Sequence, residues 1–93
     1  MSIFKEYDIR GIYPDELDEI KSEGIGKAIG TIEKEEEIFI GHDNRQGSLA
    51  INVYVKQGLV AVGKKVLDLG LVPIMVPAFA SYEEHKSAIE ITA

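Results

Sequence analysis

The strongest constraint on the fold is the repeated alternation of short apolar segments with longer segments of helical periodicity. Strands are expected at residues 3–12, 38–40, 65–70 and 88–92. Helices are expected between them, at residues 15–32, 48–63 and 73–84. The order β-α-β-α-β-α-β, with short connections, predicts a three-layer α/β/α fold in which helices cover a mostly parallel sheet.

The first helix carries the clearest start signal. Pro14 and Asp15 have the composition of a helix start, with Asp15 as the expected N-terminal cap. The apolar residues that follow fall on one helical stripe: Leu17, Ile20, Ile25, Ala28, Ile29 and Ile32. Glycines at positions 24, 26 and 30 lower the helix propensity, so we expect them to serve close packing against a neighbouring element.

Length and composition limit the class of protein. The 93 residues are enough for one small domain. A formal net charge of −6 argues against a nucleic-acid partner, because phosphate backbones bind faces rich in Lys and Arg. Cysteine is absent, which excludes disulfides and thiolate metal sites. No signal peptide and no apolar run of about 20 residues is present, so we expect no membrane partner and a cytoplasmic location.

Polar residues cluster where the first expected strand ends, in the segment Tyr7-Asp8-Ile9-Arg10-Gly11. Binding sites of parallel sheets gather beyond the carboxyl ends of the strands. Arg10 beside a glycine is suited to bind phosphate there, and Tyr7 would add a hydroxyl donor. The alternative is an edge strand in which Asp8 and Arg10 pair with each other.

The second candidate is the segment GHDNRQGS at residues 41–48, which follows the second expected strand. Its two glycines let the backbone turn sharply or approach a ligand. Arg45 supplies a planar, permanently charged fork that Asp43 could orient, and Ser48 is placed to cap the next helix. The alternative is a strand-to-helix turn held in shape by an Asp43–Arg45 pair. His42 reads as a solvated or packing residue.

Patterns that would predict catalysis by this chain alone are missing. Neither a metal-binding spacing, a phosphate-binding P-loop nor a dinucleotide fingerprint occurs. No nucleophile with a matching base can be assembled around Ser48, Ser81 or Ser87. The residues therefore predict no catalytic group and no metal ligand in this chain.

Four segments taken together resemble the α-D-phosphohexomutase family, the phosphomannomutase/phosphoglucomutase group. In chain order they are FKEYDIRG at 4–11, GHDNR at 41–45, GLVP at 70–73 and AIEITA at 88–93. The resemblance covers the whole chain, in the family's order and at family-like spacing. Its specificity comes from the first two segments in combination.

The resemblance implies a role for each candidate residue. Family enzymes have four domains around a cleft and move a phosphoryl group between the 1- and 6-positions of a hexose phosphate through a phosphoserine. Tyr7 and Arg10 match positions that approach the active-site phosphate. Asp43 and Arg45 match the loop that supports the phosphoserine region.

The resemblance also implies that residues 1–93 are an incomplete domain I. The family's phosphoserine lies in a Thr-Ala-Ser-His-Asn-Pro loop, of which this chain supplies Thr92 and Ala93. The family's magnesium loop belongs to a later domain, so magnesium is expected for full-length members and no cofactor for this chain. Ile74-Met75 and Ser87-Ala88 depart from the family pattern, and no role is assigned to residues 74–87.

The expected function is that of an N-terminal fragment of a phosphomannomutase/phosphoglucomutase without mutase turnover of its own. The alternative is a stand-alone, non-catalytic module that binds phosphate or sugar phosphate, or that mediates protein association. Weak binding of a hexose phosphate is expected near Arg10 and Arg45. Self-association is also expected, through an uncovered apolar surface or through the last strand, residues 88–92, as a bare edge.

Overall fold

The computed structural model describes residues 6–71 and 87–92. Along these ranges the elements are β1 (Glu6–Arg10), α1 (Glu19–Ile32), β2 (Glu37–His42), α2 (Ser48–Ala61), β3 (Lys65–Leu71) and β4 (Ser87–Thr92). All four expected strands and the first two expected helices are present. The third helix, expected at residues 73–84, lies outside the described residues.

The strands form a single sheet with the order β1-β4-β2-β3, and all three pairings are parallel. The predicted α/β class with a parallel sheet is therefore confirmed. The prediction that the last strand is a bare edge is wrong, because β4 lies between β1 and β2. Its central position explains its sequence: five of its six residues are buried, as in a strand with neighbours on both sides.

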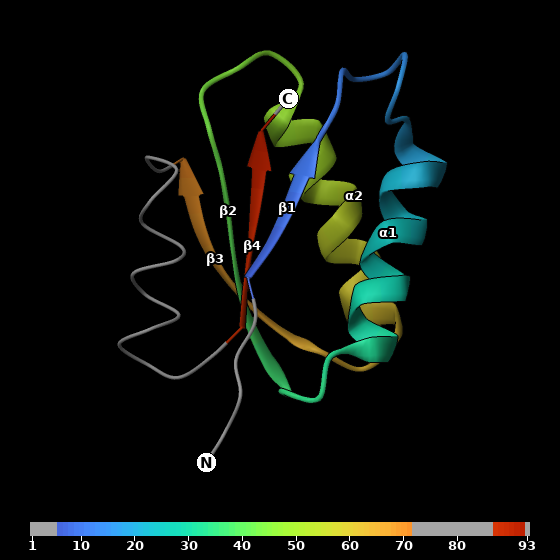
Figure 1. Cartoon of the computed structure of the whole chain (residues 1–93), viewed down its shortest axis with the longest axis vertical. Helices are drawn as coiled ribbons and strands as arrows, with labels where there is room; N and C mark the ends of the chain where they lie inside the picture. The colour runs from blue at the N-terminus through green and yellow to red at the C-terminus, as the bar shows by residue number, and fades with distance from the viewer. Residues whose placement is uncertain (1–5, 72–86, 93) are drawn as a thin grey trace.

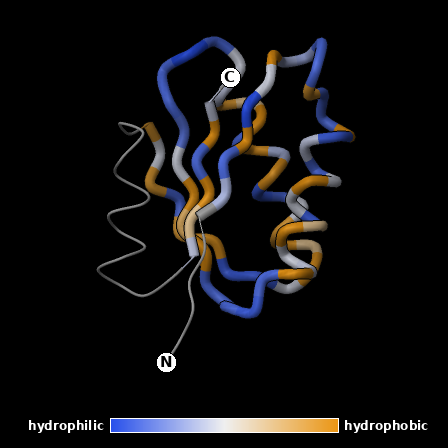
Figure 2. Tube along the Cα trace, in the orientation of Figure 1, coloured by the Kyte–Doolittle hydropathy of each residue, from blue (hydrophilic) through white to orange (hydrophobic). Residues whose placement is uncertain are grey.

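Both helices cover the same face of the sheet, as Figure 1 shows. The core between the sheet and the helices is aliphatic and consists of Ile9, Ile29, Ile38, Ile40, Ile51, Val55, Leu59, Ile89 and Ile91. β2 and β4 each contribute alternate residues to this core, as the pleat requires, whereas β3 contributes only the partly buried Val66, which packs against it. Hydropathy follows the same plan, since the loop after β2 is hydrophilic while β2 and β4 contain apolar segments (Figure 2).

Glycines allow α1 and α2 to pack with their backbones in contact. A Cβ on Gly26 would overlap the carbonyl oxygen of Val55, and one on Gly58 would lie 2.8 Å from the nitrogen of Lys27. A Cβ on Gly30 would overlap Val62, whereas one on Gly24 would meet nothing within 4 Å. The predicted packing role is confirmed for Gly26 and Gly30 and is wrong for Gly24.

The start of α1 differs from the prediction. The helix begins at Glu19, and its cap is Asp18, whose carboxylate accepts a hydrogen bond of 2.8 Å from the backbone N–H of Lys21. Residues 12–17 form turns instead, because the N–H groups of Glu16 and Leu17 both donate to the carbonyl of Ile12. Asp15 therefore caps no helix.

The predicted apolar stripe of α1 is only partly buried. Ile29 is buried and Ile25 is half-buried against the core, but Ile20 and Ile32 are 80% and 65% exposed. On α2, Leu49 and Val60 are also more than half exposed. The described surface thus contains apolar side chains on both helices.

Candidate functional site

The carboxyl ends of β1, β4 and β2 bring two sequence-predicted segments to one edge of the sheet (Figure 1). Arg10 is in register with Thr92, and the backbone N–H of Gly11 donates to the carbonyl of Thr92. On the other side of β4, the N–H of Asp43 donates to the carbonyl of Ile91 at 3.1 Å. Arg10 and the turn that begins at Asp43 therefore flank the end of β4.

Asp43 organises the turn between β2 and α2. One carboxylate oxygen accepts hydrogen bonds from the N–H of Arg45 at 3.1 Å and from the hydroxyl of Ser48. The other lies 3.4 Å from Nε of Arg45. The Asp43 side chain is 18% exposed and that of Arg45 is 66% exposed, so the pair holds the turn in shape while the guanidinium faces solvent. The structural and the ligand-binding interpretations of this segment are compatible.

The amino end of α2 lies at this edge as well. Its cap is Gly47, with φ of 93°, and no side chain caps it. The prediction that Ser48 caps the helix is wrong, because Ser48 is the first helical residue and its hydroxyl donates to Asp43. An uncapped helix start carries unsatisfied N–H groups and the positive end of the helix dipole, both of which favour an anion.

Arg10 and Asp8 lie on the face of the sheet opposite the helices. Their side chains are 65% and 55% exposed, and the guanidinium is 4.0 Å from the Asp8 carboxylate. This contact is long and solvated, so it holds Arg10 weakly. Beside them, Oγ1 of Thr92 is buried and has no hydrogen-bond partner within the described part of the chain.

The structure holds the Tyr7 hydroxyl away from this edge. Tyr7 faces the helices, and its hydroxyl donates to Glu33 at 3.0 Å, just beyond the carboxyl end of α1. Burial, together with this hydrogen bond to a carboxylate, raises the pKa of Tyr7 to about 12. Tyr7 and Arg10 therefore lie on opposite faces of β1 and do not converge on one point.

Glu33 is a buried polar centre that the sequence did not reveal. It is 5% exposed, although it begins a run of charged residues. Burial alone would raise the pKa of Glu33, but hydrogen bonds from the N–H of Glu35 and from the hydroxyls of Ser87 and Tyr7 hold it below its ordinary value. The Lys64 charge acts in the same direction. This cluster joins the ends of several elements at the amino edge of the sheet and reads as structural.

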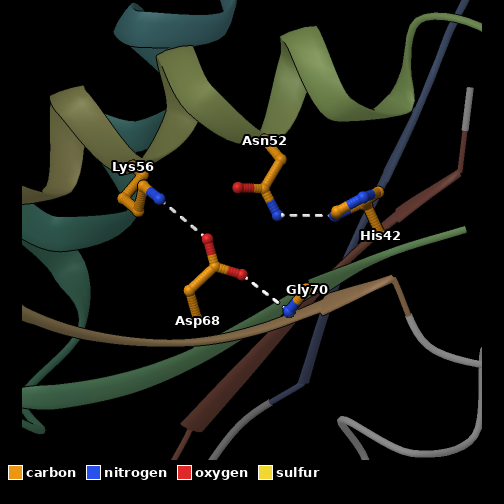
Figure 3. Close-up of polar contacts among 5 residues, drawn as sticks. All are labelled: His42, Asn52, Lys56, Asp68 and Gly70. Atoms are coloured by element: carbon orange, nitrogen blue, oxygen red, sulfur yellow. Dashed lines mark hydrogen bonds and ion pairs between the residues drawn. The ribbon is translucent and has the colours of Figure 1, made fainter.

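A second polar cluster lies between α2 and the sheet (Figure 3). Nδ2 of Asn52 is 3.2 Å from Nδ1 of His42, so His42 is a packing residue here. Lys56 lies 2.7 Å from Asp68, which also accepts a hydrogen bond from the N–H of Gly70. Burial would raise the pKa of Asp68, but Lys56, the Gly70 N–H and His42 lower it. The sequence offered one signal for this cluster, an asparagine at position 52 between the apolar residues Ile51 and Val53.

Within residues 6–71 and 87–92, no group of three or more His, Asp or Glu side chains could hold a metal ion. Over the same ranges, no helix is both long enough and apolar enough to cross a membrane. The described serines are buried, at positions 22, 48 and 87. What the edge offers chemically is two exposed guanidinium groups, a hydroxyl and an uncapped helix start.

The described residues thus form a parallel α/β fold with two exposed guanidinium groups at the carboxyl edge of its sheet. The family model described as phosphoglucomutase/phosphomannomutase, alpha/beta/alpha domain I, matches residues 1–93. The chain belongs to this family.

Curated relatives agree with the family match. A phosphomannomutase of Klebsiella pneumoniae is 38% identical over 94 residues, which cover 100% of this chain and 60% of the relative. A protein of Xanthomonas campestris pv. campestris named "Phosphohexose mutases" is 43% identical over 68 residues, covering 73% of this chain and 15% of the relative. A phosphomannomutase/phosphoglucomutase of Pseudomonas aeruginosa is 37% identical over 95 residues, which cover 98% of this chain and 20% of the relative. No solved structure matches the chain significantly.

The chain therefore spans between 15% and 60% of the length of these relatives.

Proposed function

We propose that the carboxyl edge of β1, β4 and β2 binds the phosphate group of a hexose phosphate, as domain I of a phosphomannomutase/phosphoglucomutase. The substrate class comes from the relatives' names, since phosphomannomutases and phosphoglucomutases act on sugar phosphates. The observation that carries the proposal is the placement of Arg10 and the Asp43–Arg45 turn on either side of the end of β4.

The chemistry of this edge suits a phosphate. Guanidinium groups form paired, charge-assisted hydrogen bonds with phosphate oxygens. The uncapped start of α2 adds backbone N–H donors and the dipole of a 14-residue helix. The buried hydroxyl of Thr92, next to Arg10 in register, could donate one further hydrogen bond.

We further propose that the 93-residue chain assayed alone has no mutase turnover. Phosphoryl transfer needs a positioned nucleophile and stabilisation of the transferring group. The hydroxyls of Ser48 and Ser87 are hydrogen-bonded to Asp43 and Glu33, and Ser22 is buried. Residues of this chain thus bind and orient the phosphate. Magnesium remains an expectation for full-length relatives, and since the described residues offer it no site, we assign no step to it.

The binding proposal is tested by following backbone amide signals while glucose 1-phosphate or mannose 1-phosphate is added to the chain. We expect saturable shifts at Gly11, at residues 43–48 and at Thr92, and none with unphosphorylated glucose. Arg10→Gln and Arg45→Gln should each weaken binding about tenfold, the loss typical of one charge-assisted contact. Lys34→Gln makes the same change in net charge at an exposed position and should leave binding unchanged.

Two results would overturn this proposal. Shifts that follow ionic strength alone, with equal losses in all three variants, would indicate general charge screening. Shifts confined to the amino edge, near Glu33, would place the site elsewhere. Separately, conversion of glucose 1-phosphate to glucose 6-phosphate by the pure chain, above a blank, would refute the proposed lack of turnover.

A further inference from the structure

The outer edge of β1 is a row of backbone groups that no described residue pairs with. β1 pairs with β4 on one side, and within residues 6–71 and 87–92 no strand lies on its other side. A groove of about 410 Å³ runs along this edge, lined by residues 7–10 of the strand and by Leu17, Ile25 and Ile29. A strand edge beside an apolar groove is a site for pairing with another strand.

The direction of the backbone groups can be read from the pairing with β4. The N–H of Gly11 donates to Thr92 of β4, so the N–H and C=O groups of alternate residues, 11, 9 and 7, point toward β4. The N–H and C=O groups of Asp8 and Arg10 therefore point away from β4, toward the unpaired edge. These two residues supply the donors and acceptors for a strand that pairs with this edge.

A second copy of β1, related by a two-fold axis perpendicular to the sheet, satisfies these groups in one register. In an antiparallel pair centred on Ile9, Asp8 of each copy lies opposite Arg10 of the other. Because both residues point their backbone groups outward, each such pair exchanges two hydrogen bonds, four in total by this geometry. The two Ile9 residues then form the close, non-hydrogen-bonded pair on the helical face.

Side-chain charges select the same register. Asp8 and Arg10 lie on one face of β1 and are more than half exposed, so the pairing sets two carboxylates against two guanidinium groups. Centring the pair on Asp8 instead would set two carboxylates directly opposite each other, which is destabilising. The cross-strand ion pairs also replace the weak 4.0 Å contact within the strand.

The same two-fold axis brings the α1 helices of the two copies side by side. Ile25 lines the groove, and Ile32 lies two turns further on the same stripe of α1. Ile32 is 65% exposed, which is unexplained by the fold of one copy. Apolar side chains at this position would be covered by the second helix.

We propose that the chain forms a symmetric dimer by antiparallel pairing of β1 with β1 of a second copy, centred on Ile9. The sheet thereby extends across both copies, with Asp8 and Arg10 in reciprocal ion pairs and with α1 against α1. The interface is isologous and closes after two copies.

The test is sedimentation velocity of the full 93-residue chain, with charge-reversal variants at the two paired positions. The unaltered chain should form a species of twice its 10.3 kDa mass. Asp8→Arg alone and Arg10→Asp alone each create like-charge pairs and should weaken the dimer about tenfold or more. A 1:1 mixture of these two variants restores opposite charges at both pairs and should form a heterodimer. The doubly reversed chain, which carries both changes, also has opposite charges at both pairs and should form a homodimer.

Matched controls separate this interface from a general effect of charge. Glu36→Arg, just before β2, and Lys65→Asp, on β3 at the opposite edge of the sheet from β1, reverse charges at exposed positions and should leave dimerisation unchanged. Circular dichroism checks that each variant is folded. Hydrogen exchange at the N–H groups of Asp8 and Arg10 should slow as protein concentration rises.

The remaining outcomes overturn the proposal. A chain that is monomeric at all concentrations has no such interface. A dimer that tolerates both single reversals, or that the mixed variants fail to restore, forms through another surface.

Discussion

The hydroxyl of Tyr7 donates a 3.0 Å hydrogen bond to the carboxylate of Glu33, across 26 positions of sequence. This contact connects the first strand to the end of α1. The Glu33 carboxylate also accepts a hydrogen bond from the hydroxyl of Ser87, at the start of β4. Two groups with opposite pKa shifts therefore share one buried cluster. Each shift predicts a different limb of the pH dependence of stability.

At alkaline pH, Tyr7 should make the free energy of unfolding fall. Its pKa is about 12 in the folded chain and 10.0 in the reference state, so the unfolded chain loses the proton first. The contribution is complete below pH 10 and is lost as pH rises toward about 12. Urea unfolding followed at several pH values measures this limb, and Tyr7→Phe should flatten it. An unchanged limb in that variant would show that Tyr7 is not its source.

At acid pH, Glu33 should make the free energy of unfolding fall. Its pKa in the folded chain lies below the ordinary value of 4.5, so its contribution is complete above pH 4.5 and is lost as pH falls through the folded value. Glu33→Gln should be less stable at neutral pH, because donors that served a carboxylate lose a charged acceptor. It should also show a shallower acid limb, and an acid limb as steep as that of the unaltered chain would contradict this assignment.

Because α1 and α2 pack closely at some glycines and not at others, substitution of these glycines by alanine should change stability differently. Gly26→Ala and Gly58→Ala each place a methyl group against backbone of the other helix, and should destabilise the fold by about 1–3 kcal/mol. Gly24→Ala is the matched control, because its methyl group meets nothing within 4 Å and alanine favours the helix. Thermal unfolding should rank Gly24→Ala above the unaltered chain and the other two below it. Equal losses in all three variants would mean that the helices do not cross at these glycines.

The periodicity of the sequence predicted the strands and the extents of α2 and β3 because these elements are specified by local patterns. It could not give the order of the strands, since the alternation of strand and helix is the same whether β4 is at the edge or in the middle. It also could not pair Tyr7 with Glu33 or Asn52 with His42, because those contacts join separate elements. Arg10, Asp43 and Arg45 were predicted as site residues because binding groups follow the ends of parallel strands, and the structure places Arg10 and the Asp43 turn on either side of the end of β4.

The start of α1 shows where local signals mislead. Pro14, Asp15 and Glu16 suit a helix start, but hydrogen bonds to Ile12 fold them into a turn, and Asp18 takes the capping role. Asp18→Ala should cost about 1 kcal/mol in the free energy of unfolding, while Asp15→Ala should cost little. Chemical denaturation of the two variants measures the difference. Equal costs would contradict the assignment of the cap.

Substitution of Thr92 is expected to change the stability of the fold and the binding of phosphate in opposite directions. Its hydroxyl is buried without a partner in the described part of the chain, so Thr92→Val should stabilise the fold by about 1 kcal/mol. The same change should weaken phosphate binding if the hydroxyl donates to the ligand. Thr31→Val is the control, since the Thr31 hydroxyl is exposed and donates to the carbonyl of Lys27, and it should affect neither property so strongly. Loss of stability in Thr92→Val would show that the hydroxyl is satisfied.

The most direct measurement of the central claim follows the side-chain Nε–H signals of Arg10 and Arg45 during a titration with glucose 1-phosphate. If both guanidinium groups bind one phosphate at the carboxyl edge, both signals shift with a single dissociation constant, and Arg10→Gln weakens the response of Arg45. If the two signals follow different dissociation constants, or if only one of them responds, the two arginines do not form one site and the proposed function is wrong.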